Sequence, residues 1–196
     1  MTLGRGKMKS AVHLSESKEE NRKKDKKNSL VLMKTDSFAN IMGFLTKSFG
    51  PPGLSIIYSM GIENGVHEVT ELRKELKKIE IPVAKKELLE KTLQRLSQMG
   101  WGKFQLSEFD PAAGYTNVEV EHNPFSDKCG KHDAGGCFFL HGYVAGLVSE
   151  VLEEEVTYGA PRCLDIDKNT CMLRLVRATG KPYIIQQEVP SAFTVA

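Results

Sequence analysis

The chain has 196 residues, of which 40% are hydrophobic and 27% charged, a composition typical of a globular protein with one domain or two small ones. No run of about 18 uncharged apolar residues occurs, which excludes a membrane-spanning helix, and the Lys- and Glu-rich start lacks the apolar stretch of a secretory signal. We therefore expect a cytoplasmic protein. Its four cysteines are too few for a disulfide scaffold, so their spacing is interpreted first as metal or redox chemistry.

The net charge of +2 is unevenly distributed along the chain. Residues 1–30 carry nine Lys or Arg and four acidic residues, a net charge of +5, which leaves −3 for the other 166 residues. A Lys- and Ser-rich segment with few large apolar side chains cannot bury enough surface to offset its ordering entropy, so 1–30 is predicted to be a disordered basic tail. The tail can contact nucleic acid weakly, but the acidic remainder argues against nucleic-acid binding as the main activity.

Helical periodicity covers the first half of the chain. A Gly-Pro-Pro-Gly run at 50–53 ends the first predicted helix, the Asn64-Gly65 turn ends the second, and Pro82 opens the last. The predicted helices cover residues 38–49, 54–62, 70–78 and 82–99.

Alternating apolar residues follow and predict strands. Residues 101–109 and 115–122 flank a turn and predict a β-hairpin, 137–154 predict a long helix, and two further strands are predicted over 156–163 and 171–178. This order predicts an α+β fold in which a meandering antiparallel sheet wraps around helices. We expect a single domain over 31–178, followed by a C-terminal extension over 179–196.

Several enzyme classes lack their signatures in this sequence. No glycine-rich phosphate loop, nucleophile elbow or His-Glu-x-x-His motif occurs. Classical hydrolases, kinases and NTPases are therefore unsupported.

The four cysteines follow the pattern Cys129-x7-Cys137-x25-Cys163-x7-Cys171. Zn²⁺ is commonly held by three or four thiolate or imidazole ligands, and Cys163 and Cys171 flank a turn that folds two predicted strands together. Cys137 lies at the start of the predicted long helix, where the helix dipole favours a thiolate. The spacing is therefore compatible with a zinc site.

The fourth zinc ligand is left open by the spacing. Cys129 is the soft-ligand candidate, His132 is a candidate because it lies close in sequence, and Asp165 is one because it lies inside the turn. The alternative is that all four cysteines are buried small apolar side chains without a metal.

Several segments together resemble one protein family. They are residues 118–125 (VEVEHNPF), residues 137–146 (CFFLHGYVAG), the pair Cys163 and Cys171 before Met-Leu-Arg-Leu, and residues 99–102 (MGWG). In order and spacing they are similar to the 4-vinyl reductase domain, over roughly residues 31–178.

This resemblance implies a small-ligand-binding sensor domain that is not an enzyme and commonly forms a homodimer. It implies a fold similar to the haem nitric-oxide-binding domain and to vesicle-tethering TRAPP subunits. In the metal-binding members, zinc is held by three cysteines that match Cys137, Cys163 and Cys171 and by a glutamate at the position of Ala160. This departure makes Cys129 the candidate replacement for the glutamate.

A sensor of apolar or aromatic molecules needs a cavity with aromatic walls and one or two polar anchors. Plain core packing is the alternative role for each candidate aromatic residue, and His141 is interpreted as a core or surface histidine rather than a ligand anchor. The candidate ligand-binding residues are Phe139, Tyr143, Trp101, Phe104 and Tyr58.

The leading hypothesis is a non-enzymatic small-molecule sensor with a structural zinc site. The alternative is a redox switch whose cysteines signal by thiol oxidation and metal release. The resemblance to the family supports this alternative by analogy. A reductase or reductase accessory role follows only from the family's name, and no acid–base constellation in the sequence supports it.

Overall fold

The computed structural model describes residues 33–80, 82–125, 135–158, 162–165 and 170–178, without the side chains of 135, 136 and 162–165. The predicted basic tail and C-terminal extension lie outside these residues, as do Cys129, His132 and Ala160. Contacts divide the chain into two units, Met1–Lys34 and Thr35–Ala196, and nearly all described residues belong to the second.

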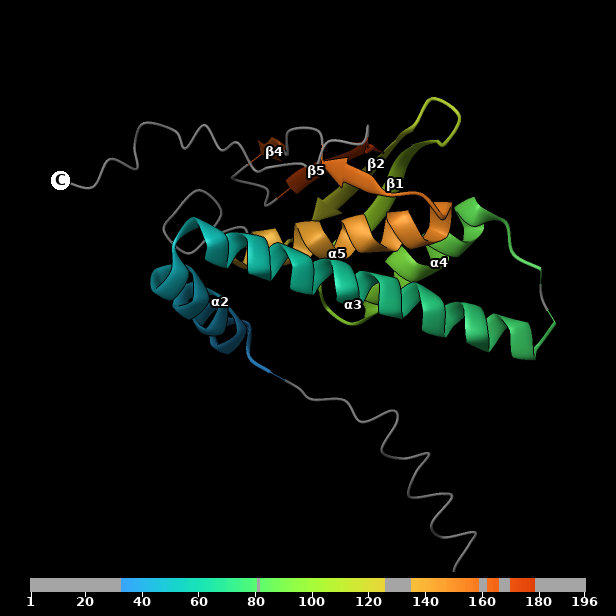
Figure 1. The fold of residues 1–196 in the computed structure, drawn as a ribbon. Helices are drawn as coiled ribbons and strands as arrows, with labels where there is room; N and C mark the ends of the chain where they lie inside the picture. Colours follow the sequence, from blue (N-terminus) through green and yellow to red (C-terminus); the bar gives the residue numbers. More distant parts are fainter. Residues whose placement is uncertain (1–32, 81, 126–134, 159–161, 166–169, 179–196) are drawn as a thin grey trace, which may run out of the picture. The chain divides into compact units, whose positions relative to one another are not determined.

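Four helices are described in the second unit, and Figure 1 shows α3 and α5 as its longest elements. Pro at the first positions of α3 follows Gly50, whose φ of 61° turns the chain sharply between α2 and α3. The helices are α2 (Thr35–Phe49), α3 (Pro51–Lys78), α4 (Lys85–Gln98) and α5 (Gly135–Leu152).

The prediction of a helix break at Asn64-Gly65 is wrong. Helix α3 is continuous over its 28 residues, and the charged segment predicted as a separate helix forms its last turns. Asn64 donates its Nδ2 hydrogen to the Met60 carbonyl oxygen one turn earlier, at 2.7 Å, so it lies within the helix. Gly65 is buried against the backbone of α5. The glycine therefore serves a close helix contact, which local turn propensity does not reveal.

The five described strands form one antiparallel sheet, in the order β1-β2-β5-β3, with β4 also paired to β5. The predicted hairpin is confirmed as β1 and β2, and the expected α+β fold with an antiparallel sheet is confirmed as well. The predicted strand over 156–163 is instead two strands, β3 and β4, which pair with different parts of β5. The strands are β1 (Lys103–Asp110), β2 (Tyr115–Glu121), β3 (Val156–Tyr158), β4 (Arg162–Asp165) and β5 (Thr170–Arg177).

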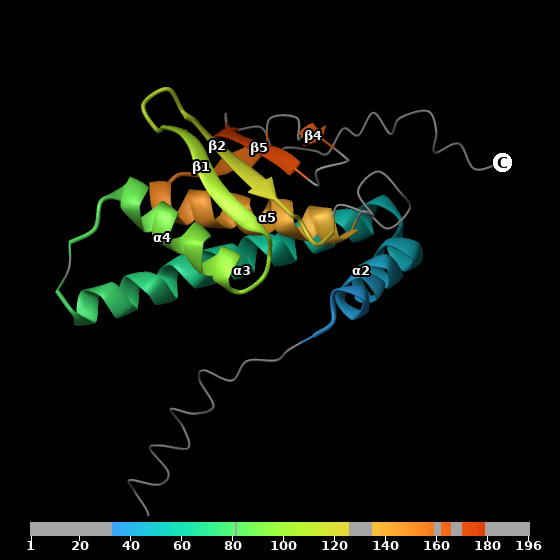
Figure 2. The same cartoon turned by 180° about the vertical axis from the view of Figure 1, so that it is seen from behind.

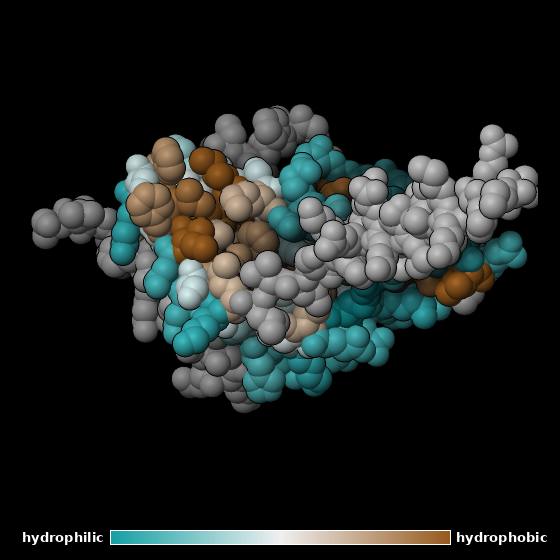
Figure 3. Space-filling model, turned by 90° about the horizontal axis from the view of Figure 1, so that it is seen from below, coloured by the Kyte–Doolittle hydropathy of each residue, from teal (hydrophilic) through white to brown (hydrophobic). Residues whose placement is uncertain are grey.

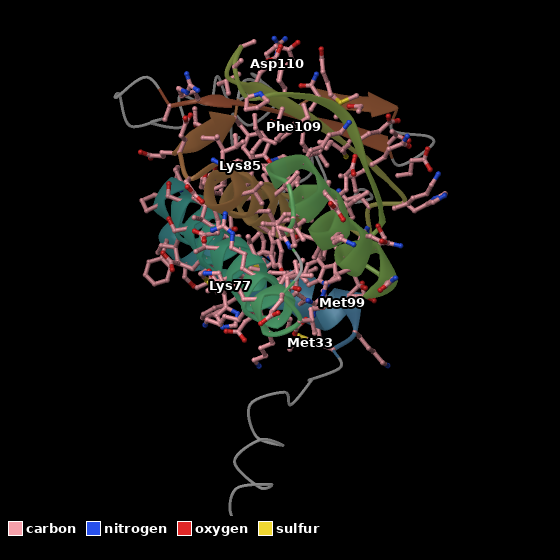
Figure 4. The ribbon with its side chains drawn as sticks, turned by 90° about the vertical axis from the view of Figure 1, so that its right-hand side faces the viewer. Met33, Lys77, Lys85, Met99, Phe109 and Asp110 are labelled. Carbon is pink, nitrogen blue, oxygen red and sulfur yellow. The ribbon has the colours of Figure 1, made fainter. Side chains whose placement is uncertain are left out.

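Helix α5 lies between the sheet and α3. Figures 1 and 2 show this order from opposite sides, and Figure 4 shows it along the helices, with α4 beside α5 under the sheet. All seven residues from 142 to 148 are buried, so this stretch of the helix is covered all round. An almost uniformly apolar sequence without a polar face is what such a position requires. In the described part of the chain, no helix is long and apolar enough to span a membrane.

Four glycines let α3 and α5 approach backbone to backbone. An added Cβ on Gly142 would overlap the Tyr58 carbonyl oxygen, and one on Gly146 would overlap that of Ile62. Gly61 and Gly65 of α3 meet carbonyl oxygens of α5 in the same way. Because the obstructing atoms are backbone atoms, a side chain at these positions forces the helices apart.

The C-terminal end of α5 is held by basic side chains from α3 and α4. Arg73 donates to the Glu150 carbonyl oxygen at 2.8 Å, and its guanidinium also pairs with the Glu150 carboxylate. Lys85, labelled in Figure 4 at the start of α4, donates to the Leu152 carbonyl oxygen at 2.7 Å. Cationic donors satisfy the unpaired carbonyls and complement the dipole at this helix end.

We expect Gly142→Ala to lower the free energy of unfolding by about 3 kcal/mol, as for an overpacked core. Alanine otherwise stabilises a helix by about 1 kcal/mol relative to glycine, so a loss identifies the α3 contact as its cause. Urea unfolding followed by circular dichroism measures the change. Ser59→Ala, at an exposed position of α3, is the matched control and should not destabilise the protein. A stabilised Gly142→Ala protein would contradict the close contact.

Candidate functional site

Five aromatic side chains form a packed group, here named the aromatic cluster. Three of them are predicted ligand-binding residues: the Trp101 ring centroid lies 5.7 Å from that of Phe139 in a stacked arrangement and 6.0 Å from that of Tyr143. Phe38 and Phe125 complete the cluster, with ring centroids 5.9 Å from that of Trp101. The structure therefore brings together three candidates, of which the first, Trp101, and the last, Tyr143, are 42 residues apart in the sequence.

The aromatic cluster joins four separate segments of the chain. Phe38 comes from α2, Phe139 and Tyr143 from α5, and Phe125 from the segment after β2. Trp101 lies between Gly100 and Gly102, whose positive φ angles of 85° and 118° belong to a backbone path that favours glycine. Sequence reasoning missed Phe38 and Phe125 as site residues, although Phe38 begins the predicted helix over 38–49 and Phe125 ends the segment 118–125.

The other two candidate ligand-binding residues lie elsewhere. Phe104 of β1 is buried opposite Val120 and makes no described ring contact within the aromatic cluster. The Tyr58 ring lies edge-on to that of Tyr158, with centroids 6.2 Å apart. Tyr158 also contacts His141 of α5, at a centroid distance of 5.1 Å. Tyr58, His141 and Tyr158 form a second group, the tyrosine–histidine cluster, between α3, α5 and β3.

Burial shifts the pKa values of two members of the tyrosine–histidine cluster, His141 and Tyr158. Desolvation by the surrounding side chains lowers the pKa of His141 to about 4, so its imidazole is uncharged at pH 7. Burial raises the pKa of Tyr158 well above its ordinary value. The Tyr158 hydroxyl oxygen is buried and makes no hydrogen bond to any described residue. A buried polar atom without a partner is uncommon and costs free energy, which makes this hydroxyl a candidate ligand contact.

Burial also shifts the pKa of Tyr143 in the aromatic cluster. Burial raises the pKa of its hydroxyl, and the negative charge of Glu68 adds to this effect, while Arg95 opposes it. Arg95 lies 3.3 Å from the Glu68 carboxylate, so both charges come from one ion pair. His141, Tyr143 and Tyr158 are therefore all uncharged at pH 7.

Two of the predicted zinc ligands meet at a buried asparagine. Asn123 is 2% exposed, and its Nδ2 lies 3.8 Å from the Cys137 sulfur and 3.7 Å from the Cys171 sulfur. The strand register pairs Cys171 with Cys163 of β4. Three of the four cysteines are thus brought to one end of α5 at the level of the backbone. Asn123 lies in residues 118–125, one of the segments that carry the family resemblance, but sequence reasoning assigned it no role.

The described part of the chain does not test the zinc site itself. Within it, no three His, Cys, Asp or Glu side chains come together as a metal-binding group. Cys129 and His132 lie outside that part, as do the side chains of Cys163 and Asp165. Cys137 is disulfide-bonded, to a residue whose side chain is likewise not described, and Cys171 is a buried thiol.

No protein-family model matches the chain, and no curated protein matches it significantly. Among solved structures, the chain is similar to the phenol-responsive sensory domain of the transcription activator PoxR, with phenol, at 18% identity and a TM-score of 0.61. The match covers 76% of each chain. The fold is shared with that sensory domain. A trafficking protein particle complex subunit 3 from Naegleria fowleri, covalently bound to palmitic acid, matches at 14% identity, 74% and 95% coverage and a TM-score of 0.47.

We expect His141 to make the protein less stable in mild acid. The pKa of His141 in the folded protein, about 4, lies below the ordinary value of 6.5. Its contribution to the free energy of unfolding is therefore complete above pH 6.5 and is lost as the pH falls toward 4. Between pH 7 and pH 5 the loss is about 2 kcal/mol, because the unfolded chain alone takes up the proton. Urea unfolding at both values measures it.

His141→Phe should remove that part of the acid sensitivity. His67→Ala, at an exposed position of α3, is the matched control and should keep the wild-type pH dependence. An unchanged pH dependence in His141→Phe would contradict the assignment.

Proposed function

We propose that this protein is a non-enzymatic sensor domain of the 4-vinyl reductase type that binds a small apolar or aromatic molecule. The observation that carries the proposal is the buried Tyr158 hydroxyl without a described hydrogen-bond partner, next to the neutral imidazole of His141. The shared fold with a phenol-responsive sensory domain supports it.

A ligand with an aromatic ring and a hydroxyl group suits the tyrosine–histidine cluster. A hydroxyl can accept a hydrogen bond from Tyr158 or donate one to a neutral imidazole nitrogen, and the rings of Tyr58 and Phe138 supply apolar surface beside them. Satisfying a buried hydroxyl recovers free energy of about 1 to 3 kcal/mol. A charged ligand gains no ionic partner from these uncharged groups, so the proposal is restricted to neutral molecules.

The aromatic cluster remains the other candidate location for the ligand. Its predicted members, Trp101, Phe139 and Tyr143, offer more ring surface, but their close mutual packing is equally what a core requires. Phe104 supplies apolar surface under the sheet. Variants of the two clusters therefore decide between them.

We expect phenol to bind the full-length protein in isothermal titration calorimetry and Tyr158→Phe to weaken binding about tenfold. Loss of one buried hydrogen bond, worth about 1.4 kcal/mol, accounts for this factor. Folding stability should not fall in this variant, because the hydroxyl makes no described hydrogen bond. Tyr115→Phe, whose hydroxyl bonds to Glu108 at the exposed surface, is the matched control.

The result can contradict the proposal in two ways. Absence of phenol binding by the wild-type protein at millimolar concentration would overturn phenol as a ligand. Full-strength binding by Tyr158→Phe, combined with loss of binding in Phe139→Leu, would move the ligand to the aromatic cluster.

A structural zinc ion is the second part of the proposal. Cys137 and Cys171 fit it because their sulfurs share one amide donor, and thiolates are preferred zinc ligands. Cys163, paired in register with Cys171, would be the third ligand, and Cys129 the fourth in place of His132 or Asp165. Bound zinc would cross-link the start of α5 to strands β4 and β5.

The alternative role for these cysteines is a redox switch. The disulfide at Cys137 is compatible with it, because a disulfide sulfur is not a thiolate ligand and zinc binding therefore requires the reduced form. Oxidation and metal binding would then be mutually exclusive states of the same cysteines.

We expect about one zinc ion per chain, measured by atomic absorption after reduction, zinc addition and desalting, because a closed thiolate site binds zinc tightly. Cys171→Ser should lose it, whereas Cys129→Ser tests the fourth position. Reduced wild-type protein without zinc would contradict the structural site, and zinc that survives mild peroxide would contradict the switch.

The homodimer expected from the resemblance is also kept as a proposal. Exposed hydrophobic side chains gather over α2 and the start of α3, as Figure 3 shows, and apolar patches of this kind mark protein contacts. A second copy of the chain would bury the same patch on both sides of a twofold axis. Sedimentation equilibrium tests this stoichiometry. The patch consists of Ile41, Phe44, Phe49, Ile56 and Met60.

A further inference from the structure

A three-residue segment, residues 123–125, joins the cysteines to the aromatic cluster. It follows β2 and contains Asn123, which contacts two cysteine sulfurs, and Phe125, which contacts the Trp101 and Phe38 rings. Both residues are buried, at 2% and 4% exposure. Helix α5 also joins the two groups, because it carries both Cys137 and Phe139, whose ring contacts that of Phe38.

Asn123 uses both ends of its side-chain amide. Its NH₂ group has two hydrogens and lies within weak hydrogen-bond distance of two sulfurs, 3.8 Å from that of Cys137 and 3.7 Å from that of Cys171. Its Oδ1 accepts the Phe125 backbone N–H at 2.9 Å, the two-residue turn typical of asparagine. A displacement of either sulfur is therefore opposed by, or passed on to, the turn that places Phe125.

Phe125 is held from the cysteine side as well. The Cys137 sulfur lies 3.6 Å from the Phe125 carbonyl oxygen, so backbone atoms on both sides of this residue contact the cysteine group. Its ring lies 5.9 Å from the Trp101 ring and 5.6 Å from the Phe38 ring, measured between centroids. A close-packed interior transmits such displacements because it contains little void to absorb them.

We propose that Asn123 is a positioning residue that couples the chemical state of the cysteines to the aromatic cluster through Phe125. Binding of zinc or reduction of the Cys137 disulfide changes the distances between the sulfurs that Asn123 bridges, and the turn moves the Phe125 ring against Trp101. The coupling rests on the proposed cysteine site for its trigger but not on any ligand of the sensor. It assigns to the cysteines an effect on the ring positions beyond stabilising the fold.

Trp101 is the chain's single tryptophan, so its fluorescence reports on the aromatic cluster directly. The experiment uses the full-length protein, reduced with tris(2-carboxyethyl)phosphine and then titrated with zinc chloride. In the reduction, the phosphine takes an oxygen atom from water and the disulfide becomes two thiols. Trp101 emission is recorded before reduction, after it and at each zinc addition, and bound zinc is measured in parallel after desalting.

Two variants separate the coupling from a structural role. Asn123→Ser keeps an oxygen that can accept the Phe125 N–H, while its short hydroxyl cannot reach both sulfurs. Phe125→Leu keeps apolar volume but removes the ring beside Trp101. Both retain every cysteine, so bound zinc is measured for each variant and the emission changes are compared at saturating zinc. Asn64→Ser, at an exposed position of α3, is the control, and circular dichroism verifies that each variant is folded.

We expect wild-type emission to change with zinc and to saturate when the site is filled. The change should fall below half of the wild-type value in Asn123→Ser and Phe125→Leu and stay intact in Asn64→Ser. Zinc binding without an emission change in the wild-type protein overturns the coupling, and so does a full response in both variants. If no zinc binds, the zinc proposal fails. The emission change on reduction alone is then compared among the wild-type protein and the three variants, and the coupling again requires a change below half of the wild-type value in Asn123→Ser and Phe125→Leu.

Discussion

The close backbone contact between α3 and α5 is the constraint on which the other elements depend. Gly61, Gly65, Gly142 and Gly146 leave no room for a Cβ, so the two helices meet along their backbones rather than through interleaved side chains. The sheet then closes over the opposite side of α5. Residues 142–148 of α5 are all buried, which explains why this part of its sequence has so few polar residues.

Each side of this central helix supplies a different chemical group. Phe139 and Tyr143, four residues apart, share a side and enter the aromatic cluster. His141 lies on another side, against Tyr158 of β3, and Cys137 lies near the first turn, close to Cys171. Rigid placement of α5 thus sets the positions of all three groups at once. A displacement of one of these groups therefore acts on the same helix that positions the other two.

Buried polar atoms are retained in this core at a cost. Asn123 offsets the cost locally, because its amide bonds to sulfurs and to a backbone N–H. Tyr158 has no described hydrogen-bond partner for its hydroxyl, and His141 gives up its charge. Apolar replacements of similar size would fill the same space with less desolvation cost. The Tyr158 hydroxyl without a described partner is the physical reason for the proposal of a ligand contact at this position.

The sequence by itself determined the elements that depend on local pattern. Alternating residues on either side of the turn at 110–114 predicted the β1–β2 hairpin, and apolar periodicity predicted α2, α4 and α5, because side-chain period and turn residues act over a few positions. The same local reasoning failed at Asn64-Gly65 and over 156–163. There, contact with α5 and pairing with different parts of β5 outweigh turn and strand propensity.

The candidate site divides in the same way. Sequence identified Trp101, Phe139 and Tyr143 as aromatic candidates and the cysteines as a set, since residue type and spacing are visible in the chain. Only the tertiary structure separated Tyr58 from that group and joined it to His141 and Tyr158. Ring contacts, the loss of charge by burial and the sharing of Asn123 between two sulfurs arise between segments distant in sequence. No local pattern encodes them, because they exist only once the helices and the sheet have packed.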